Sequence, residues 1–155
     1  MKLRKPLNTP EETAAFSHKL GARLHAGDCL LLSGDVGAGK THFARALIQS
    51  LLATPEDVPS PTFTLVQTYD AQSGLEIWHA DLYRLGDPSE IEELGLIEAM
   101  EIAICLIEWP DRLTSLRPQD ALDITLTATD VEDHRTLTAE WSDPKWNAKF
   151  TDWIT

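Results

Sequence analysis

Two kinds of apolar spacing alternate along this chain. Short continuous apolar runs, which are typical of buried strands, occupy residues 29–32 and 102–108. Apolar residues recur every three or four positions over residues 16–24 and again over residues 41–52, as they do along one face of a helix. Residues 122–127 alternate between apolar and polar positions, as in a strand with one buried face. Strands and helices in alternation predict an α/β fold around a central, largely parallel sheet.

Polar residues and prolines indicate where helices begin. Residues 9–12, Thr-Pro-Glu-Glu, combine an N-cap threonine, a proline at the first helical position and a glutamate three residues after the cap. Gly27 is expected to end this helix, and Pro88 to open a short one in the middle of the chain. Residues 142–144, Ser-Asp-Pro, predict the start of a last helix. Three aromatic residues fall on one face of that helix: Trp146, Phe150 and Trp153.

Two pairs of strand-like segments predict antiparallel hairpins. Residues 63–69 and 75–81 flank a turn that contains glycine, and residues 122–127 and 136–141 flank a polar turn. We therefore expect a P-loop NTPase-like three-layer sandwich, in which the hairpins add antiparallel strands to the central parallel sheet. The length is most simply that of a single domain over residues 1–155.

A glycine-rich segment carries the strongest chemical signal. Residues 34–41 read Gly-Asp-Val-Gly-Ala-Gly-Lys-Thr and match the phosphate-binding pattern G-x-x-x-x-G-K-[ST], between an expected strand and an expected helix. Glycines let the backbone approach a phosphate closely, and successive N–H groups with the helix N-terminus attract the anion. The motif predicts that Lys40 reaches the β- and γ-phosphates and that the Thr41 hydroxyl ligates Mg²⁺.

Two carboxylates are candidates for the remaining chemistry. Asp81 and Glu108 each end an apolar strand-like run, a position at the rim of the sheet beside the phosphate-binding loop. One could hold Mg²⁺ and the other could orient a water or a partner group. The sequence alone leaves open which of them touches the metal, and either could be a strand-end turn acid.

Further residues have both a functional and a structural interpretation. Thr62 lies in the stretch Ser-Pro-Thr-Phe-Thr of residues 60–64, where a hydroxyl can meet the γ-phosphate or where proline can stiffen a turn. Trp109 can pack near a nucleotide, although covering the end of the sheet is favoured by the residues alone. Three arginines can contact phosphate or remain solvated or salt-bridged: Arg84, Arg112 and Arg135.

Charge and cysteine usage narrow the classes of function. A net charge of −12 disfavours a protein that binds nucleic acid strongly with its own surface, because such binding needs lysines and arginines to neutralise phosphates. Cys29 and Cys105 lie in apolar runs, which favours buried free thiols in a reducing, cytoplasmic setting. The five histidines form no metal-binding pair, and no apolar run is long enough to span a membrane.

Taken together, these motifs resemble the TsaE family, the ATPase component of bacterial tRNA threonylcarbamoyladenosine biosynthesis. The resemblance extends over about residues 5–141, and the blocks are specific jointly where the phosphate-binding loop alone is not. The matching blocks, in order, are Thr9-Pro10-Glu11-Glu12-Thr13, residues 34–41, Ser60-Pro61-Thr62-Phe63-Thr64-Leu65-Val66, His79-Ala80-Asp81-Leu82-Tyr83-Arg84-Leu85 and Leu106-Ile107-Glu108-Trp109-Pro110. The aromatic segment at the C-terminal end matches no block of the family.

The resemblance implies roles for individual residues. Thr41 and Glu108 would hold Mg²⁺, Asp81 would be the essential acid, and Thr62 a switch-like threonine. His42 is a departure, because many members carry a second threonine there, and we expect it to alter packing more than Mg²⁺ binding. The residues that the resemblance places around ATP are Thr9, Asp35, Val36, Gly37, Ala38, Gly39, Lys40, Thr41, His42, Trp109 and Arg135.

The resemblance also implies partners and an activity. TsaE-like proteins act with TsaD and TsaB, which carry the catalytic site and contact tRNA, and ATP hydrolysis supports repeated turnover of the modification next to the anticodon. Slow intrinsic hydrolysis is expected of an isolated small P-loop domain. A small-molecule kinase and a non-hydrolysing nucleotide-sensing scaffold remain alternatives. A GTP-dependent switch is disfavoured, because neither Asn8 nor Asn147 begins an Asn-Lys-x-Asp motif.

Overall fold

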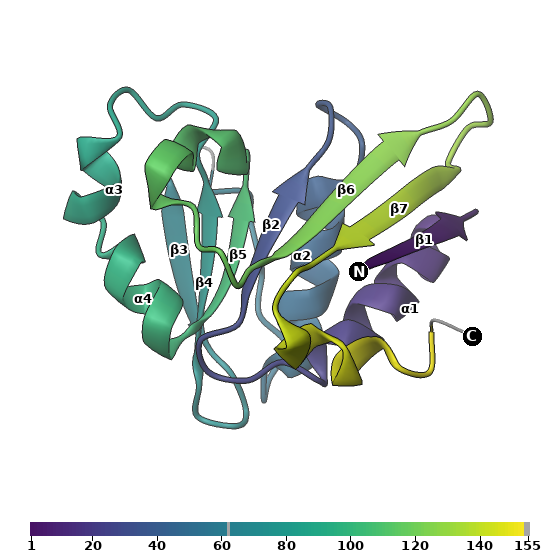
Figure 1. Cartoon of the computed structure of the whole chain (residues 1–155), viewed down its shortest axis with the longest axis horizontal. Helices are drawn as coiled ribbons and strands as arrows, with labels where there is room; N and C mark the ends of the chain where they lie inside the picture. Colours follow the sequence, from purple (N-terminus) through teal and green to yellow (C-terminus); the bar gives the residue numbers. More distant parts are fainter. Residues whose placement is uncertain (62, 154–155) are drawn as a thin grey trace.

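A computed structural model describes residues 1–61 and 63–153 (Figure 1). In that part of the chain, one seven-stranded sheet has the order β1-β7-β6-β2-β5-β4-β3. The strands β6, β2, β5 and β4 are parallel, whereas the β3–β4, β6–β7 and β1–β7 pairs are antiparallel. This arrangement confirms the predicted parallel centre with added hairpins. The strands are β1 (Lys2–Leu7), β2 (Cys29–Ser33), β3 (Val66–Asp70), β4 (Glu76–Asp81), β5 (Ile104–Glu108), β6 (Leu122–Ala128) and β7 (Arg135–Glu140).

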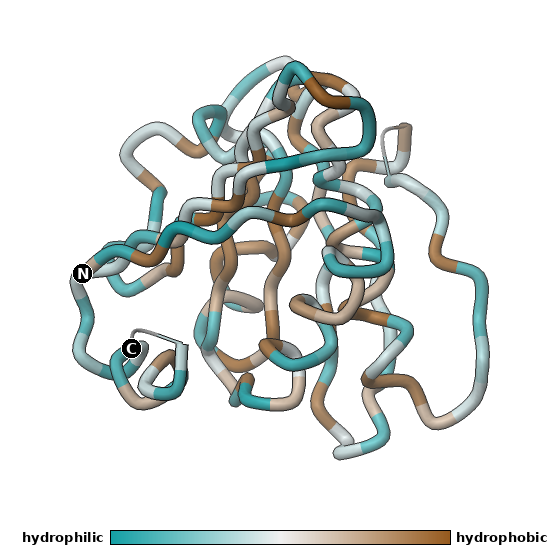
Figure 2. Tube along the Cα trace, turned by 90° about the vertical axis from the view of Figure 1, so that its right-hand side faces the viewer, coloured by the Kyte–Doolittle hydropathy of each residue, from teal (hydrophilic) through white to brown (hydrophobic). Residues whose placement is uncertain are grey.

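Helices cover both faces of the sheet and make three layers. Leu30 and Leu32 of β2 pack into one core cluster with residues of α1 and α2, whereas Leu31, between them, packs into the other with residues of α3 and α4. The strands β2 and β5 are apolar along most of their length because both of their faces are covered, and brown strands run through the middle of the molecule in Figure 2. The helices are α1 (Pro10–Gly21), α2 (Lys40–Leu51), α3 (Ser89–Glu93) and α4 (Leu96–Ile102), with 3₁₀ helices η1 (Pro110–Leu116), η2 (Pro144–Trp146) and η3 (Ala148–Phe150).

Several predicted boundaries were wrong, each for a local reason. The strand expected from residue 63 begins at Val66, because Leu65 has a left-handed φ of 67° that extended backbone does not allow. The strand expected from Ile102 begins at Ile104, because Ile102 is the exposed last residue of α4, a helix that the sequence did not indicate separately. The first helix is capped by Thr9 as predicted, yet it ends at Gly21 rather than near Gly27.

Each end of the chain forms elements that the residue pattern did not predict. Residues Lys2–Leu7 form an edge strand on β7, although their mostly exposed side chains show no strand alternation. The predicted last helix consists instead of two 3₁₀ turns, capped as expected by Asp143. In the described part of the chain, no helix combines the length and apolar character needed to cross a membrane.

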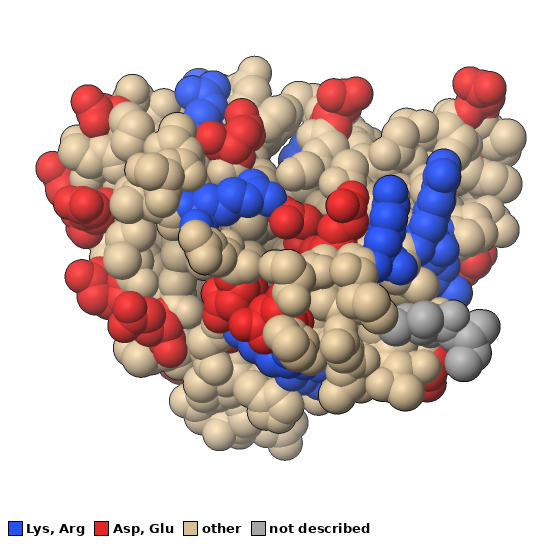
Figure 3. All heavy atoms as spheres, in the orientation of Figure 1, with Lys and Arg blue, Asp and Glu red and all other residues tan. Residues whose placement is uncertain are grey.

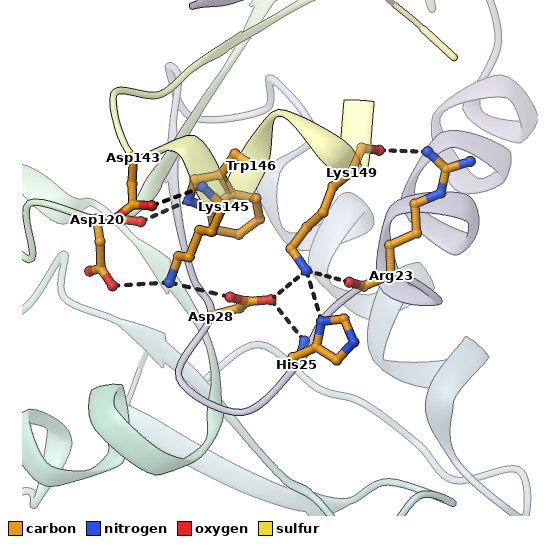
Figure 4. A network of polar contacts seen from close by, with 8 residues as sticks. All are labelled: Arg23, His25, Asp28, Asp120, Asp143, Lys145, Trp146 and Lys149. Atoms are coloured by element: carbon orange, nitrogen blue, oxygen red, sulfur yellow. Dashed lines mark hydrogen bonds and ion pairs between the residues drawn. The ribbon is translucent and has the colours of Figure 1, made fainter. Parts of the chain in front are cut away.

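A polar network fastens the C-terminal turns to the loop between α1 and β2 (Figure 4). Buried Asp28 lies 3.3 Å from the ammonium groups of both Lys145 and Lys149. Lys149 also donates to the carbonyl of Arg23, and the Trp146 indole donates to the carbonyl of Asp120. Each charge in this network has an opposite charge or carbonyl beside it, which offsets the cost of removing it from water.

Gly34 packs so closely against β6 that there is no room for a side chain, and a substitution can test this packing. A Cβ at Gly34 would lie 2.5 Å from the carbonyl oxygen of Leu126, and its φ of 144° is unfavourable for other residues. Gly37 has a φ of 84°, but a Cβ there would meet no atom of the described residues within 4 Å. We expect Gly34→Ala to lower the thermal midpoint more than Gly37→Ala. Both variants would carry backbone strain of about 1–3 kcal/mol, but only Gly34→Ala would add a clash with the backbone of Leu126. Equal midpoints in thermal denaturation would contradict this packing.

Candidate functional site

A cleft of about 460 Å³ opens at the carboxyl ends of the parallel strands. The loop after β2 leads into α2, while β4 and β5 end side by side at Asp81 and Glu108, which are register partners. Ligands of open α/β sheets bind at this edge because loops and strand-end side chains converge there. The cleft is lined by Val36, Gly37, Gly39, Lys40, Thr41, His42, Ser60, Asp81, Tyr83, Arg84, Glu108 and Trp109.

The loop of residues 34–41 has the backbone geometry of an anion site. Gly37 and Gly39 adopt left-handed φ angles of 84° and 104°. Gly39 is the N-cap of α2, and no side chain of the described residues caps the helix, so the first N–H groups of α2 are available to a ligand in the cleft. These donors and the helix dipole together suit a phosphate group.

Lys40 places a positive charge inside this loop. Its ammonium donates to the carbonyls of Gly34 and Asp35, and it lies 4.2 Å from the centre of the Trp109 ring. The side chain is buried, and burial lowers the pKa of Lys40, whereas the nearby carboxylates of Glu108, Asp81 and Asp35 oppose that shift. Those carboxylates therefore favour the charged form that a phosphate would need.

Thr41 and Glu108 meet across the floor of the cleft. The Thr41 hydroxyl donates to Glu108 Oε1 at 2.9 Å, and His79 Nε2 lies 2.7 Å from Glu108 Oε2. Glu108 is 1% exposed, so both of its oxygens are held by protein groups rather than by solvent. Asp81 is also buried, and its Oδ1 accepts from the backbone N–H of Tyr83.

This donor set fits Mg²⁺ bound together with a nucleotide. Within the described ranges, no three His, Cys, Asp or Glu side chains gather as a self-sufficient metal site. Mg²⁺ does not require one, because it usually keeps several waters and takes one or two protein ligands plus phosphate oxygens. A hydroxyl and a carboxylate oxygen 2.9 Å apart at a phosphate-binding loop match that pattern.

Trp109 directly follows Glu108 and turns its ring over the cleft. Its φ of 58° is left-handed, which ends β5 abruptly and starts η1. The ring lies 4.9 Å from that of Tyr83 and contacts the Lys40 ammonium. Trp109 thus lines the cleft, where its place beside a nucleotide remains a prediction, and it also packs against the core on the side of α3 and α4.

Four residues expected around the nucleotide do not line the cleft: Thr9, Asp35, Ala38 and Arg135. The Thr9 hydroxyl accepts from the N–H of Glu12 and caps α1. His42 does line the cleft, and its Nε2 lies 3.0 Å from the carbonyl of Pro10, so it links α2 to the start of α1. Thr62 lies outside the described residues.

Arg135 contacts the backbone of the loop and is not among the residues that line the cleft. Its Nε donates to the carbonyl of Ala38 at 3.0 Å, and its Nη2 donates to that of Gly37 at 3.2 Å. We expect Arg135→Ala to weaken ATP binding about 3- to 10-fold, because losing roughly 1 kcal/mol of loop order leaves the direct phosphate donors in place. Arg117→Ala, which removes an arginine paired with Asp123 outside the cleft, is the matched control in calorimetric titrations. Unchanged affinity in Arg135→Ala would contradict a loop-holding role.

Three lining residues are not in the set that the resemblance places around ATP: Ser60, Tyr83 and Arg84. Of these, only Arg84 was a candidate phosphate contact in the sequence, as one of three such arginines. Arg84 packs its guanidinium 4.7 Å from the centre of the exposed Phe63 ring. All three lining residues belong to the motif blocks of residues 60–66 and 79–85. Membership of a block was therefore the signal in the sequence that could have pointed to them. Their convergence depends on the hairpin returning to the loop, which spacing along the chain does not show.

Comparison with known proteins identifies the family. The model of the family described as "Threonylcarbamoyl adenosine biosynthesis protein TsaE" matches residues 7–137. The chain belongs to the TsaE family. This result confirms the resemblance inferred from the motif blocks, and it leaves the C-terminal turns outside the matched range.

Relatives in the TsaE family share the greater part of the chain. The tRNA threonylcarbamoyladenosine biosynthesis protein TsaE of Rickettsia conorii is 43% identical over 124 residues, which are 80% of this chain and 70% of the relative. That of Bacillus subtilis is 40% identical over 132 residues, covering 84% and 81%. The crystal structure of Bacillus subtilus YdiB superimposes with a TM-score of 0.81 and 28% identity, covering 98% of this chain and 93% of that one.

Proposed function

We propose that this protein is an ATPase that binds ATP with Mg²⁺ and hydrolyses it slowly, in support of tRNA threonylcarbamoyladenosine biosynthesis. Membership of the TsaE family and the names of its relatives support the pathway. The observation that carries the activity is the 2.9 Å contact of Thr41 with Glu108 at the uncapped start of α2, beside Lys40. The hydrogen-bond donors that would bind the phosphates therefore lie next to the two side chains that would bind the metal.

ATP would be held chiefly by its phosphates. The N–H groups at the start of α2 and the Lys40 ammonium supply donors for the β- and γ-phosphates. The cleft of about 460 Å³ lies in the range of small-molecule sites. Trp109 and Tyr83 present aromatic surface beside those donors.

Thr41 and Glu108 would hold the metal, and Asp81 would act on the attacking water. Mg²⁺ held there would help to neutralise the charge that develops on the phosphate oxygens. Asp81, the register partner of Glu108, is buried in the cleft with a carboxylate that can orient a water or accept its proton. Its Oδ1 is held by the N–H of Tyr83, which fixes the direction of the carboxylate.

The proposal includes partners that resemble TsaD and TsaB and that carry the tRNA. On the face drawn in Figure 3, basic side chains are interrupted by acidic and neutral ones instead of forming one continuous stripe. Together with the net charge of −12, this supports tRNA reached through a partner. The free, buried thiols of Cys29 and Cys105 support a cytoplasmic setting.

The deciding experiment measures ATP hydrolysis by the protein alone and with purified TsaD and TsaB homologues from the same source. We expect slow hydrolysis alone and stimulation in the mixture, because an isolated P-loop domain generally lacks a group that completes the transition state. The same mixture with Lys40→Ala is the control. Tight ATP binding without stimulation would instead favour a nucleotide-sensing scaffold, and phosphoryl transfer to a small acceptor would favour a kinase.

A further inference from the structure

His79 lies behind Glu108, outside the motif chemistry described so far. It is fully buried in the middle of β4, two residues before Asp81, and is the register partner of Leu106 on β5. Because side chains alternate along a strand, His79, Asp81 and Glu108 face the same side of the sheet. That side carries α2, whose first turn holds Thr41.

The hydrogen bonding of His79 is one-sided. Its Nε2 lies 2.7 Å from Glu108 Oε2, whereas its Nδ1 is buried and has no hydrogen-bond partner among the described residues. A neutral imidazole carries its proton on one nitrogen only. With the proton on Nε2, the ring donates to the carboxylate and leaves a bare lone pair at Nδ1. With the proton on Nδ1, a buried N–H would be unpaired and two acceptors would face each other, which costs more.

Each carboxylate oxygen of Glu108 contacts a different side chain. His79 engages Oε2, and the Thr41 hydroxyl engages Oε1 at the edge of the cleft. A glutamate side chain has three rotatable bonds, so a second fixed contact restricts the direction in which its carboxylate faces. Thr41 can donate to Oε1 and still offer an oxygen lone pair to a cation.

We propose that His79 is a positioning residue that donates from Nε2 to Glu108 and fixes its carboxylate so that Oε1 faces Thr41 and the metal. This inference rests on the proposed Mg²⁺–ATP site. Groups that hold metal-binding carboxylates in this way commonly change metal affinity or activity by about 10- to 100-fold when they are removed. His79 itself lines no part of the cleft and need not touch the nucleotide.

A matched pair of variants distinguishes a positioning role of His79 from an effect of its size or polarity alone. His79→Gln can place an amide N–H near the position of Nε2, whereas His79→Asn can reach only the position of Nδ1. ATP binding is measured by calorimetry with Mg²⁺ and with EDTA, after circular dichroism has shown that each variant is folded. We expect Mg²⁺ to tighten ATP binding in wild type and His79→Gln, and this tightening to fall about 10-fold or more in His79→Asn. Binding in EDTA should be alike in all three.

A spectroscopic measurement tests the same inference without nucleotide. Long-range ¹H–¹⁵N spectra of the histidine rings distinguish the two neutral tautomers, and His79→Gln assigns the signals by their disappearance. We expect His79 to carry its proton on Nε2. A proton on Nδ1 would overturn the inference.

The outcomes also distinguish His79 from the site it serves. If Mg²⁺ does not change the affinity of the wild-type protein for ATP, the proposed metal site is rejected, and the proposed role of His79 is rejected with it. If wild type responds to Mg²⁺ and His79→Asn responds equally, only the role of His79 is overturned. A loss of affinity in EDTA as large as in Mg²⁺ would indicate a structural role and would likewise overturn positioning.

Discussion

Replacing Lys40 with alanine is expected to weaken ATP binding by at least about 100-fold, since a hydrogen bond to a charged group contributes about 1.5–3 kcal/mol and Lys40 supplies more than one. The ammonium is already directed into the loop, where it contacts the carbonyls of Gly34 and Asp35. The loop amides would remain, so weak residual binding is compatible with the proposal. Calorimetric titration with ATP in Mg²⁺ measures the change.

The control for Lys40→Ala must remove the same charge elsewhere. Lys19→Ala does so on α1, where the lysine pairs with Asp152 and lies over the Trp153 ring, outside the cleft. We expect Lys19→Ala to bind ATP as wild type does. Wild-type affinity in folded Lys40→Ala would remove the phosphate-binding assignment and, with it, the proposed ATPase.

The second large effect is expected in hydrolysis rather than binding. Asp81→Asn should lower partner-stimulated turnover by about 100-fold or more, within the 10²–10⁴-fold range of general acid–base catalysis, and should change ATP affinity only a few-fold. Asparagine keeps an oxygen that can accept from the Tyr83 N–H, so the turn after β4 should survive. Turnover under saturating ATP and calorimetric affinity together separate the two effects.

Asp70→Asn is the matched control, because Asp70 is an exposed acid at the other end of the same hairpin. Wild-type turnover in Asp81→Asn would reject the catalytic role of Asp81. A loss of the Mg²⁺-dependent part of ATP affinity would assign Asp81, rather than Glu108, to the metal. Position in the sequence does not decide which of the two acids binds the metal, since both end neighbouring parallel strands. This measurement would decide it.

Local signals predicted the elements in which neighbouring residues make the decisive interactions. The Thr9 cap is such a case, because a side chain satisfies an N–H only three residues away. The expected strand, loop and helix around residues 34–41 also form as predicted, since glycines at left-handed φ and an apolar helix face are readable within a short window.

Elements stabilised by distant partners were predicted less well. The edge strand Lys2–Leu7 has mostly exposed side chains and extends along β7, more than a hundred residues later, so its own pattern carries little information. The start of β3 was misplaced because a single left-handed residue, Leu65, interrupts a run with high strand propensity. The contacts of Arg135 with the loop carbonyls of Gly37 and Ala38 likewise depend on the distant β6–β7 hairpin, and its place beside a nucleotide stays a prediction.

By itself, the sequence determined the glycine-rich loop between strand and helix, the α/β class with its parallel centre, and the family, because these depend on residue types at fixed short spacings. Only the tertiary structure decided how the site is assembled. Thr41 and Glu108 are 67 residues apart along the chain, and the order of strands in the sheet brings their oxygens within 2.9 Å. The same strand order places His79 beside Glu108, which is its hydrogen-bond partner within the part of the chain that the structure describes. Such contacts arise from strand order and register, which no local pattern of residues specifies.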